Sequence, residues 1–291
     1  MKPASFEYYD PTTVDQAVAL LREQADAKLL AGGQSLVPLL NMRLARPAVI
    51  VDLNRVEGLD YIRRTNGHLA IGAMTRQRAI ERSELVANAQ PLLHAATRMI
   101  AHPQIRNRGT IGGSLAHADP AAEYPAVALA LDAELVAVGP NGERAIKAED
   151  LFVTYLTTAL EPADVLTEVR VPVLPERTGW SFQEVSRRHG DFALAGVAAT
   201  LTLGSRGECA GARIALFGVA PTPVRARAAE EALAGEAPSD ALFERAAQRA
   251  SDGLDETLSD VHATAEFRRH LAQVLTRRAL TEAAARAQAA R

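Results

Sequence analysis

Two adjacent glycines interrupt an apolar stretch that reads LLAGGQSLVPLL at residues 29–40. The run before Gly32 and Gly33 suits a buried strand. The run after them starts like a helix, with Pro38 acceptable only in its first turn. Glycine permits a positive φ and lets a ligand approach the main chain, and helix N-termini attract anions. The stretch alone predicts either a phosphate-binding turn or, equally well, a tight strand-to-helix turn capped by Ser35.

A second diglycine motif, GTIGGS at residues 109–114, favours the phosphate interpretation. It again combines two glycines with the hydroxyl side chains of Thr110 and Ser114. Helical patterning stops around it, so we expect a long polar loop, and such loops in compact domains are usually functional. Two loops of this kind fit one diphosphate, as in a dinucleotide. Because G-x-G-x-x-G and G-x-x-x-x-G-K-[ST] are both absent, a Rossmann dehydrogenase and a P-loop NTPase are disfavoured.

The order of apolar patterns predicts an α+β protein. Thr13 should cap a helix from Val14, and apolar runs at 28–31 and 48–53 flank a helix over 35–44, which suggests a parallel βαβ unit. A second segment should contain strands at 68–73 and 164–173, a helix after Thr75, a helix at 90–101, and a hairpin over 133–146 around Asn141 and Gly142. Strands at 179–188, 192–203 and 212–220 should form a meander, followed by helices to the end of the chain.

The composition disfavours several kinds of partner and cofactor. The net charge is −3, so we expect no nucleic-acid partner, and no apolar stretch is long enough for a membrane span. The start MKPASFEYYDP has no signal-peptide core, which favours a cytoplasmic location. Cys209 is the only cysteine, so this chain alone cannot hold an iron–sulfur cluster; we interpret it as a small apolar filler. We expect no metal at His117, Asp119 and Glu123, because no second ligand cluster accompanies them.

The two glycine motifs carry a family resemblance. AGGQSLVPLL followed by RNRGTIGGSLAHADPAAE resembles the FAD-binding medium subunit of molybdenum hydroxylases, a group that includes the carbon monoxide dehydrogenase medium subunit and the flavin domain of xanthine dehydrogenase. The N-terminal F-x-Y-x-x-P, the stretch SRRHGDFALAGVAA and the tail AEFRRHLAQVLTRRAL extend the resemblance over essentially the whole chain.

The resemblance implies a definite domain organisation. Residues 1–175 should form a two-lobed PCMH-type FAD-binding domain, with lobes at about 1–56 and 57–175. Residues 176–291 should form a carbon monoxide dehydrogenase flavoprotein-like domain, in which a three-stranded antiparallel sheet accompanies a helical bundle. In the final helix we expect an apolar stripe of Phe267, Leu271, Val274 and Leu275 beneath a solvated arginine-rich face.

The same resemblance implies which residues bind FAD. The first motif would hold the diphosphate, the second would complete the cradle, and an acidic residue would hold the ribose or adenine side. Leu166 would lie near the adenine, and Ala101, His102 and Asp191 near the isoalloxazine ring. Gln183 stands in a segment where relatives often carry lysine, which leaves the flavin potential open. The full predicted set is Lys28, Leu30, Ala31, Gly32, Gly33, Gln34, Ser35, Leu36, Ala101, His102, Thr110, Ile111, Gly112, Gly113, Ser114, Glu123, Leu166, Gln183 and Asp191.

The implied role is that of one subunit in a larger oxidoreductase, with no catalytic residue of its own. FAD would receive electrons from [2Fe–2S] clusters on a small partner, while substrate is oxidised at the molybdenum cofactor of a large partner, in a doubled heterotrimer. The segments 102–108 and 189–192 should face a partner, with Arg106, Arg108 and Arg188 as basic contacts. A self-sufficient FAD-dependent oxidase or reductase, and a non-catalytic assembly subunit, stay open as alternatives.

Overall fold

The computed structural model describes residues 1–289. Its N-terminal lobe is a three-stranded parallel sheet in the order β1-β3-β2, with two α-helices. The elements are β1 (Glu7–Tyr9), α1 (Val14–Glu23), β2 (Ala27–Leu30), α2 (Leu36–Asn41), β3 (Val49–Asp52) and the 3-10 helix η1 (Leu53–Arg55). The predicted βαβ unit is therefore confirmed. Strand β1 was not predicted, and α2 ends three residues earlier than expected.

The predicted start of α1 is confirmed in detail. Thr13 Oγ1 accepts a hydrogen bond from the Gln16 N–H at 3.2 Å. Gln16 Oε1 in turn accepts one from the Thr12 N–H at 2.9 Å. These reciprocal bonds satisfy donors at the helix N-terminus. They orient α1 so that its apolar face packs on the parallel sheet, in a core that includes Ala17 and Val18.

The second lobe is built on a five-stranded antiparallel sheet in the order β4-β5-β10-β6-β7, with helices on one face. The predicted strands at 68–73 and 164–173, the hairpin and the helix at 90–101 are confirmed. The elements are β4 (Ile62–Thr65), β5 (His68–Gly72), α3 (Gln77–Arg82), α4 (Glu84–Ala89), α5 (Pro91–Met99), α6 (Pro103–Arg106), α7 (Ile111–His117), α8 (Glu123–Ala130), β6 (Glu134–Gly139), β7 (Gly142–Lys147), α9 (Ala148–Leu151), β8 (Phe152–Thr154), β9 (Thr157–Thr158) and β10 (Val165–Pro172).

Two local predictions for this lobe are wrong. The segment around the second glycine motif is not one long loop, because it contains the short helices α6 and α7. Thr75 does not cap α3, whose N-cap is Arg76. The Thr75 hydroxyl instead donates to the Tyr61 carbonyl at 2.9 Å. This long-range bond is invisible to a local sequence pattern.

The C-terminal part is an antiparallel sheet in the order β11-β12-β13-β14, followed by helices. Its three long strands follow the predicted meander, and β14 adds a short fourth strand. The elements are β11 (Thr178–Ser186), β12 (Ala193–Leu203), β13 (Cys209–Phe217), β14 (Val224–Arg225), α10 (Arg227–Leu233), α11 (Asp240–Gln248), the 3-10 helix η2 (Arg249–Ser251) and α12 (Ala265–Ala289).

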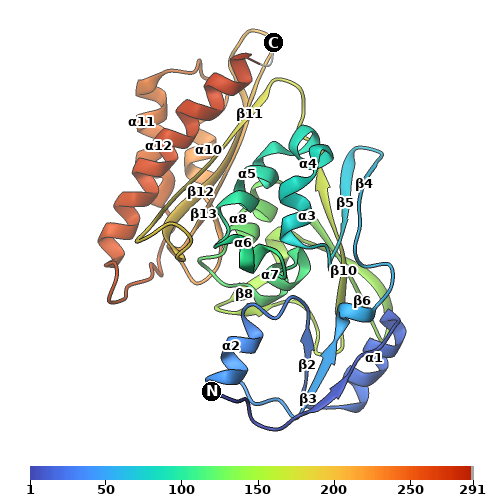
Figure 1. Ribbon diagram of the computed structural model, residues 1–291. Coiled ribbons are helices and arrows are strands. Elements are labelled where there is room, and N and C mark those ends of the chain that lie inside the picture. Colours follow the sequence, from blue (N-terminus) through green and yellow to red (C-terminus); the bar gives the residue numbers. More distant parts are fainter. Residues whose placement is uncertain (290–291) are drawn as a thin grey trace.

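The C-terminal sheet lies between two layers of helices (Figure 1). Helices α10 to α12 cover one of its faces, and α5 and α8 pack against the other. Beyond those helices lies the five-stranded sheet, with the N-terminal lobe at one end. Because β12 is covered on both faces, it is rich in alanine and reads as a continuous apolar run. None of the helices within residues 1–289 combines the length and the apolar character that a membrane span requires.

The predicted stripe of α12 is only partly correct. Leu275 is buried, but Phe267 is 45% exposed. In its place Arg268 is buried, and its guanidinium donates to the carbonyls of Leu194 and Gly218 and to Asp260. An arginine that satisfies buried carbonyls joins the core side of the helix, which hydropathy alone does not indicate.

Candidate functional site

The structure brings the two glycine motifs into direct contact, as the sequence predicts. A Cβ atom on Gly32 would lie 2.3 Å from the carbonyl oxygen of Arg108 and 2.7 Å from Cα of Gly109. A Cβ on Gly113 would lie 3.2 Å from Cβ of Ala31. The two main chains therefore approach so closely that no side chain fits between them at Gly32. The motifs form one site, although they lie on different lobes.

The first motif presents a run of unsatisfied main-chain donors. Within residues 1–289, no hydrogen-bond acceptor is found for the N–H groups of Gly32, Gly33, Gln34, Ser35 and Leu36. Buried or half-buried N–H groups are normally paired, so such a run indicates a site for an external acceptor. Ser35 occupies the N-cap of α2 but makes no side-chain capping bond, so the alternative of a serine-capped turn is not what the structure shows.

The second motif is already hydrogen-bonded within the chain. The N–H groups of Ile111 and Gly112 donate to the carbonyls of Thr75 and Ala73 at 3.2 and 2.9 Å. The Gly113 N–H donates to Thr110 Oγ1 at 3.1 Å, because Thr110 caps α7. This motif therefore fixes the shape of the cradle more than it supplies main-chain donors. The N–H groups of Ile111, Gly112 and Gly113 are thus engaged within the chain, and contact of these three residues with FAD stays a prediction.

The glycines are required for reasons other than ligand approach. Gly33 has φ of +74°, a conformation that glycine adopts without steric cost. A Cβ on Gly112 would lie 2.5 Å from Cβ of Ala73, at the end of β5. Both positions demand glycine because of the protein's own backbone and packing.

The segment at Ala101 and His102 meets the turn that follows β11. A Cβ on Gly190 would lie 2.4 Å from Cε1 of His102, and the rings of His102 and His189 pack edge to face with centroids 6.3 Å apart. Ala101 has φ of 40°, which is unusual for a residue with a Cβ and often accompanies a functional site. The structure thus joins the two segments that the resemblance places near the isoalloxazine ring.

Asp191 lies in this turn, where its carboxylate is 3.6 Å from the Arg187 guanidinium. Gln183 does not face the same way. Its amide donates to Glu282 of α12 at 2.8 Å, on the sheet face that the C-terminal helices cover. Phe182 packs into the core shared with α5 and α8. Since side chains alternate along a strand, Glu184 and not Gln183 shares the face of Phe182.

Glu123 and Glu184 are half-buried carboxyl groups near enough for the charge of Glu184 to act on Glu123, a pairing that sequence reasoning did not identify. Glu123 begins α8. Burial, followed by the nearby charge of Glu184, raises its pKa to about 8. Burial raises the pKa of Glu184 to about 7, and its Oε2 atom has no hydrogen-bond partner within residues 1–289. At neutral pH the pair therefore retains a proton. The sequence signal that could have indicated Glu184 is the alternation of side chains along the strand, which places it on the same face as Phe182.

The raised pKa values predict a stability that falls with pH. The folded chain binds more protons than the unfolded chain between about pH 4.5 and 8, so the free energy of unfolding should decrease across that window and level off above it. Glu184→Gln removes one titrating group, and should reduce this decrease by about 1–3 kcal/mol. Thermal unfolding at several pH values measures this change in the pH dependence of stability. Glu57→Gln, at an exposed position, is the control. Equal pH profiles for wild type and Glu184→Gln would contradict the raised pKa.

The remaining predicted residues lie around the cradle or behind it. Lys28 is exposed on β2, opposite Ile50 of β3, and Leu30 ends that strand beside Gly33. Leu166 is buried in β10, in the core that also contains α7 and α8 residues. Gln34 folds back, so that its Nε2 donates to the Gly32 carbonyl at 3.1 Å.

Arg106 is not an exposed partner contact, and that prediction is wrong. Its side chain is 8% exposed and pairs with Glu81 at 3.0 Å. It also donates to the carbonyl oxygens of Ile100 and Ala101 at 2.7 and 3.3 Å. Arg106 therefore anchors the strained Ala101 segment from inside. Arg108 and Arg188 are exposed.

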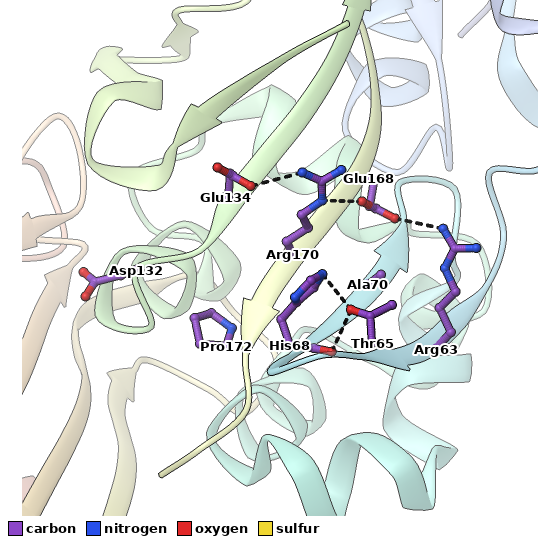
Figure 2. Close-up of a pocket in the computed structure, with 9 residues that line it drawn as sticks. All are labelled: Arg63, Thr65, His68, Ala70, Asp132, Glu134, Glu168, Arg170 and Pro172. Carbon is purple, nitrogen blue, oxygen red and sulfur yellow. Dashed lines mark hydrogen bonds and ion pairs between the residues drawn. The ribbon is translucent and has the colours of Figure 1, made fainter.

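A hollow of about 420 Å³ lies elsewhere, on the open face of the five-stranded sheet (Figure 2). Arg170 on β10 pairs there with Glu168 at 2.6 Å and Glu134 at 3.2 Å, and Glu168 also meets Arg63 at 3.3 Å. None of the predicted cofactor residues lines it. Two arginines and three carboxylates line it, and most of these charges are paired with one another, so it does not compete with the glycine cradle as the candidate site.

Cys209 is buried in the C-terminal core, as predicted for an apolar filler. Burial raises the pKa of its thiol to about 11, which disfavours a reactive thiolate. Among residues 1–289, no group of three or more His, Cys, Asp and Glu side chains is arranged to hold a metal ion. Asp119, one of the residues considered for such a group, accepts a hydrogen bond from the Ala121 N–H at 2.9 Å.

Comparison with known proteins covers nearly the whole chain. Residues 4–174 match the family described as FAD binding domain in molybdopterin dehydrogenase, and residues 180–283 match the CO dehydrogenase flavoprotein C-terminal domain. The 6-hydroxypseudooxynicotine dehydrogenase complex subunit alpha of Paenarthrobacter nicotinovorans is 46% identical over 99% of this chain and 97% of its own.

Solved structures show the same fold. Carbon monoxide dehydrogenase from Hydrogenophaga pseudoflava superposes with a TM-score of 0.95 at 42% identity, covering 98% of this chain and 99% of the matched chain. Quinoline 2-oxidoreductase from Pseudomonas putida 86 gives a TM-score of 0.94 at 37% identity, covering 99% of each chain. The touching glycine motifs, both domain matches and these whole-chain similarities agree, and the chain therefore belongs to the FAD-binding medium subunits of the carbon monoxide dehydrogenase and xanthine dehydrogenase family.

Proposed function

We propose that the first glycine motif holds the diphosphate of FAD. The observation that carries this proposal is the run of five main-chain N–H groups, from Gly32 to Leu36, without an acceptor. Convergent N–H groups at a helix start suit two negatively charged phosphates, because the donors and the helix dipole act on the same anion. We propose that the hydroxyl groups of Ser35 and Ser114 donate to the same diphosphate. The residues present thus fit a dinucleotide diphosphate.

We place the isoalloxazine ring at the junction of the Ala101–His102 segment and the 189–192 turn. The support is the direct contact of His102 with Gly190, together with Phe192, which is 65% exposed on the same turn. Glu123 stays proposed as the acidic residue that holds the ribose or adenine side of FAD. Lys28, Leu30 and Leu166 stay proposed as neighbours of the cofactor.

We infer that the chain passes electrons from a partner's [2Fe–2S] clusters to an external acceptor, as one subunit of a molybdenum hydroxylase. Bound FAD supplies the ability to take electrons singly and to release them singly or as a pair. This chain's own residues would bind the diphosphate and orient the ring. Small iron–sulfur and large molybdenum-containing subunits, in a doubled heterotrimer, are the proposed partners; relatives named medium chain or complex subunit support this.

We propose that the exposed side of the 189–192 turn, with Arg188 and Arg108, meets the iron–sulfur subunit. The domain boundary near residue 175, and the division of residues 1–175 into lobes at about residue 56, are likewise proposals, supported by three separate core clusters. One of these clusters includes Ala193 and Phe217 of the C-terminal sheet, so the proposed domains share a packed boundary. The cytoplasmic location stays a prediction.

Purification of the full chain, alone and with its co-purifying subunits, tests the function. We expect a yellow protein that binds one FAD and oxidises no substrate until partners are present. Turnover by the chain alone would favour a self-sufficient oxidase or reductase. A colourless protein that does not bind added FAD, in either preparation, would favour an assembly subunit and overturn the proposed cradle.

A further inference from the structure

We propose that Asn54 and Arg76 are positioning residues, which hold the two glycine motifs in the arrangement that binds FAD. This inference rests on the proposed function of the cradle. Neither residue belongs to a glycine motif, and sequence reasoning did not single out either one. Together their side chains connect the carbonyl of Ala31, in the first motif, with the carbonyl of Arg108, which immediately precedes the second.

Asn54 controls the first motif through one peptide group. Its Nδ2 atom donates to the Ala31 carbonyl at 2.9 Å. The peptide bond is planar and trans, so the Gly32 N–H points away from the Ala31 carbonyl within the same plane. By holding that carbonyl, Asn54 orients the first of the five unsatisfied N–H groups. The amide acts on the cradle without being one of its donors.

Asn54 is itself held from the end of β3. Asp52 Oδ1 accepts hydrogen bonds from the Asn54 main-chain N–H at 2.9 Å and from its Nδ2 at 2.5 Å. Asp52 Oδ2 accepts another from the Tyr8 hydroxyl at 2.6 Å. That bond raises the pKa of Tyr8 to about 12, so Tyr8 keeps its proton and remains the donor. The orientation of the Asn54 amide is therefore determined by both neighbouring strands, β1 and β3.

Arg76 completes the connection to the second motif. Its Nη2 donates to Asn54 Oδ1 at 2.6 Å, while Nη1 donates to the Arg108 carbonyl. The main chain reinforces this link: Arg76 forms an isolated antiparallel bridge with Thr110, and the Gln77 N–H donates to the Gly109 carbonyl at 2.8 Å. A guanidinium suits this position because its donors lie in one rigid plane and can bind two acceptors at once.

The Arg108 carbonyl oxygen is also the atom that a Cβ on Gly32 would meet first, at 2.3 Å. Arg76 thus binds the contact point of the two motifs, and Asn54 binds the residue before Gly32. Removal of either side chain releases one carbonyl and also removes the hydrogen bond that joins Asn54 to Arg76. The two losses should therefore not add, because the pair acts as a unit.

FAD titration of deflavinated protein tests the proposal, using the full chain with the subunits that co-purify with it. Asn54→Leu and Arg76→Met keep side-chain size and remove the hydrogen bonds. We expect each to weaken FAD binding about 10- to 100-fold, the usual effect of losing hydrogen bonds with a charged group. The double variant should lose no more affinity for FAD than the single variant that binds FAD more weakly. Arg76→Lys should recover part of the affinity that Arg76→Met loses. Exposed Arg82→Met and Asn88→Leu, in α3 and α4, serve as matched controls.

Further measurements separate positioning from general stability. Amide hydrogen exchange at residues 32–36 should become slow when FAD binds to the wild type, and this protection should decrease in both variants. The visible spectrum of the FAD that still binds should stay unchanged, since the ring is proposed at the His102 junction. Additive losses, wild-type affinity in both variants, or losses fully explained by lower thermal stability of the FAD-free protein would overturn the inference. Absence of FAD binding by the wild type would instead overturn the proposed function.

Discussion

The Gly32→Val variant is expected to bind FAD at least about a hundredfold more weakly than the wild type, while most of the secondary structure is retained. A Cβ at this position would overlap the Arg108 carbonyl oxygen, 2.3 Å away, and Cα of Gly109. Both obstacles are main chain, so the two motifs must separate before a side chain fits. Separation would disperse the five N–H donors of the first motif. FAD stoichiometry and affinity measure the loss, and circular dichroism measures the retained secondary structure.

Gly211→Val is the matched control for Gly32→Val. Gly211 lies in β13, has no positive φ, and has no atom within 4 Å of an added Cβ. It should keep its FAD. Undiminished binding by Gly32→Val would show that close approach of the two motifs is unnecessary for the cradle. Gly112→Val is less informative, because its Cβ meets Ala73 and should damage the second lobe as well.

Arg106→Ala should lower the free energy of unfolding by about 1–3 kcal/mol, the usual cost of leaving buried polar groups unsatisfied, because Glu81 keeps its second ion pair with Arg78. Arg106 pairs with Glu81 at 3.0 Å, and both side chains are almost fully buried. Its guanidinium also satisfies the carbonyls of Ile100 and Ala101. The variant should therefore destabilise the segment proposed to border the flavin ring. Chemical denaturation of the full chain measures the change.

Arg188 provides the comparison for Arg106, because both were predicted as partner contacts. Arg188 is exposed, so Arg188→Ala should change the free energy of unfolding by less than about 0.5 kcal/mol. Charge reversal at Arg188 should instead weaken assembly with the iron–sulfur subunit while FAD is retained. Equal stability of Arg106→Ala and the wild type would show that the buried pair contributes nothing. Normal assembly of Arg188→Glu would move the proposed interface elsewhere.

The local sequence was sufficient for most secondary structure. Thr13 and Gln16 indicate the start of α1 because capping depends on residues three apart. The apolar runs at β3 and β12 are continuous because both strands are buried. Such a run therefore predicts a buried strand without knowledge of what covers it. Thr75 failed as a predicted cap because its hydroxyl bonds to Tyr61, which a strand pairing brings near.

The candidate site was likewise predicted only in part from the sequence. The diglycine motifs identified the cradle from sequence, since few conformations explain two such pairs flanked by hydroxyl residues. Sequence could not show which motif has free N–H groups, because the acceptors for Ile111 and Gly112 come from Thr75 and Ala73. It also missed Glu184, whose importance depends on which face of β11 meets α5.

The sequence by itself determined the family, the α+β class and the cofactor motifs, because these depend on residue types at short, regular spacing. Only the tertiary structure decided how the motifs work. It buried Arg106, directed Gln183 toward α12, brought Glu123 near Glu184, and connected Ala31 to Arg108 through Asn54 and Arg76. Each of these outcomes joins residues far apart in the chain. Their hydrogen bonds and pKa values follow from burial and distance, which no local pattern specifies.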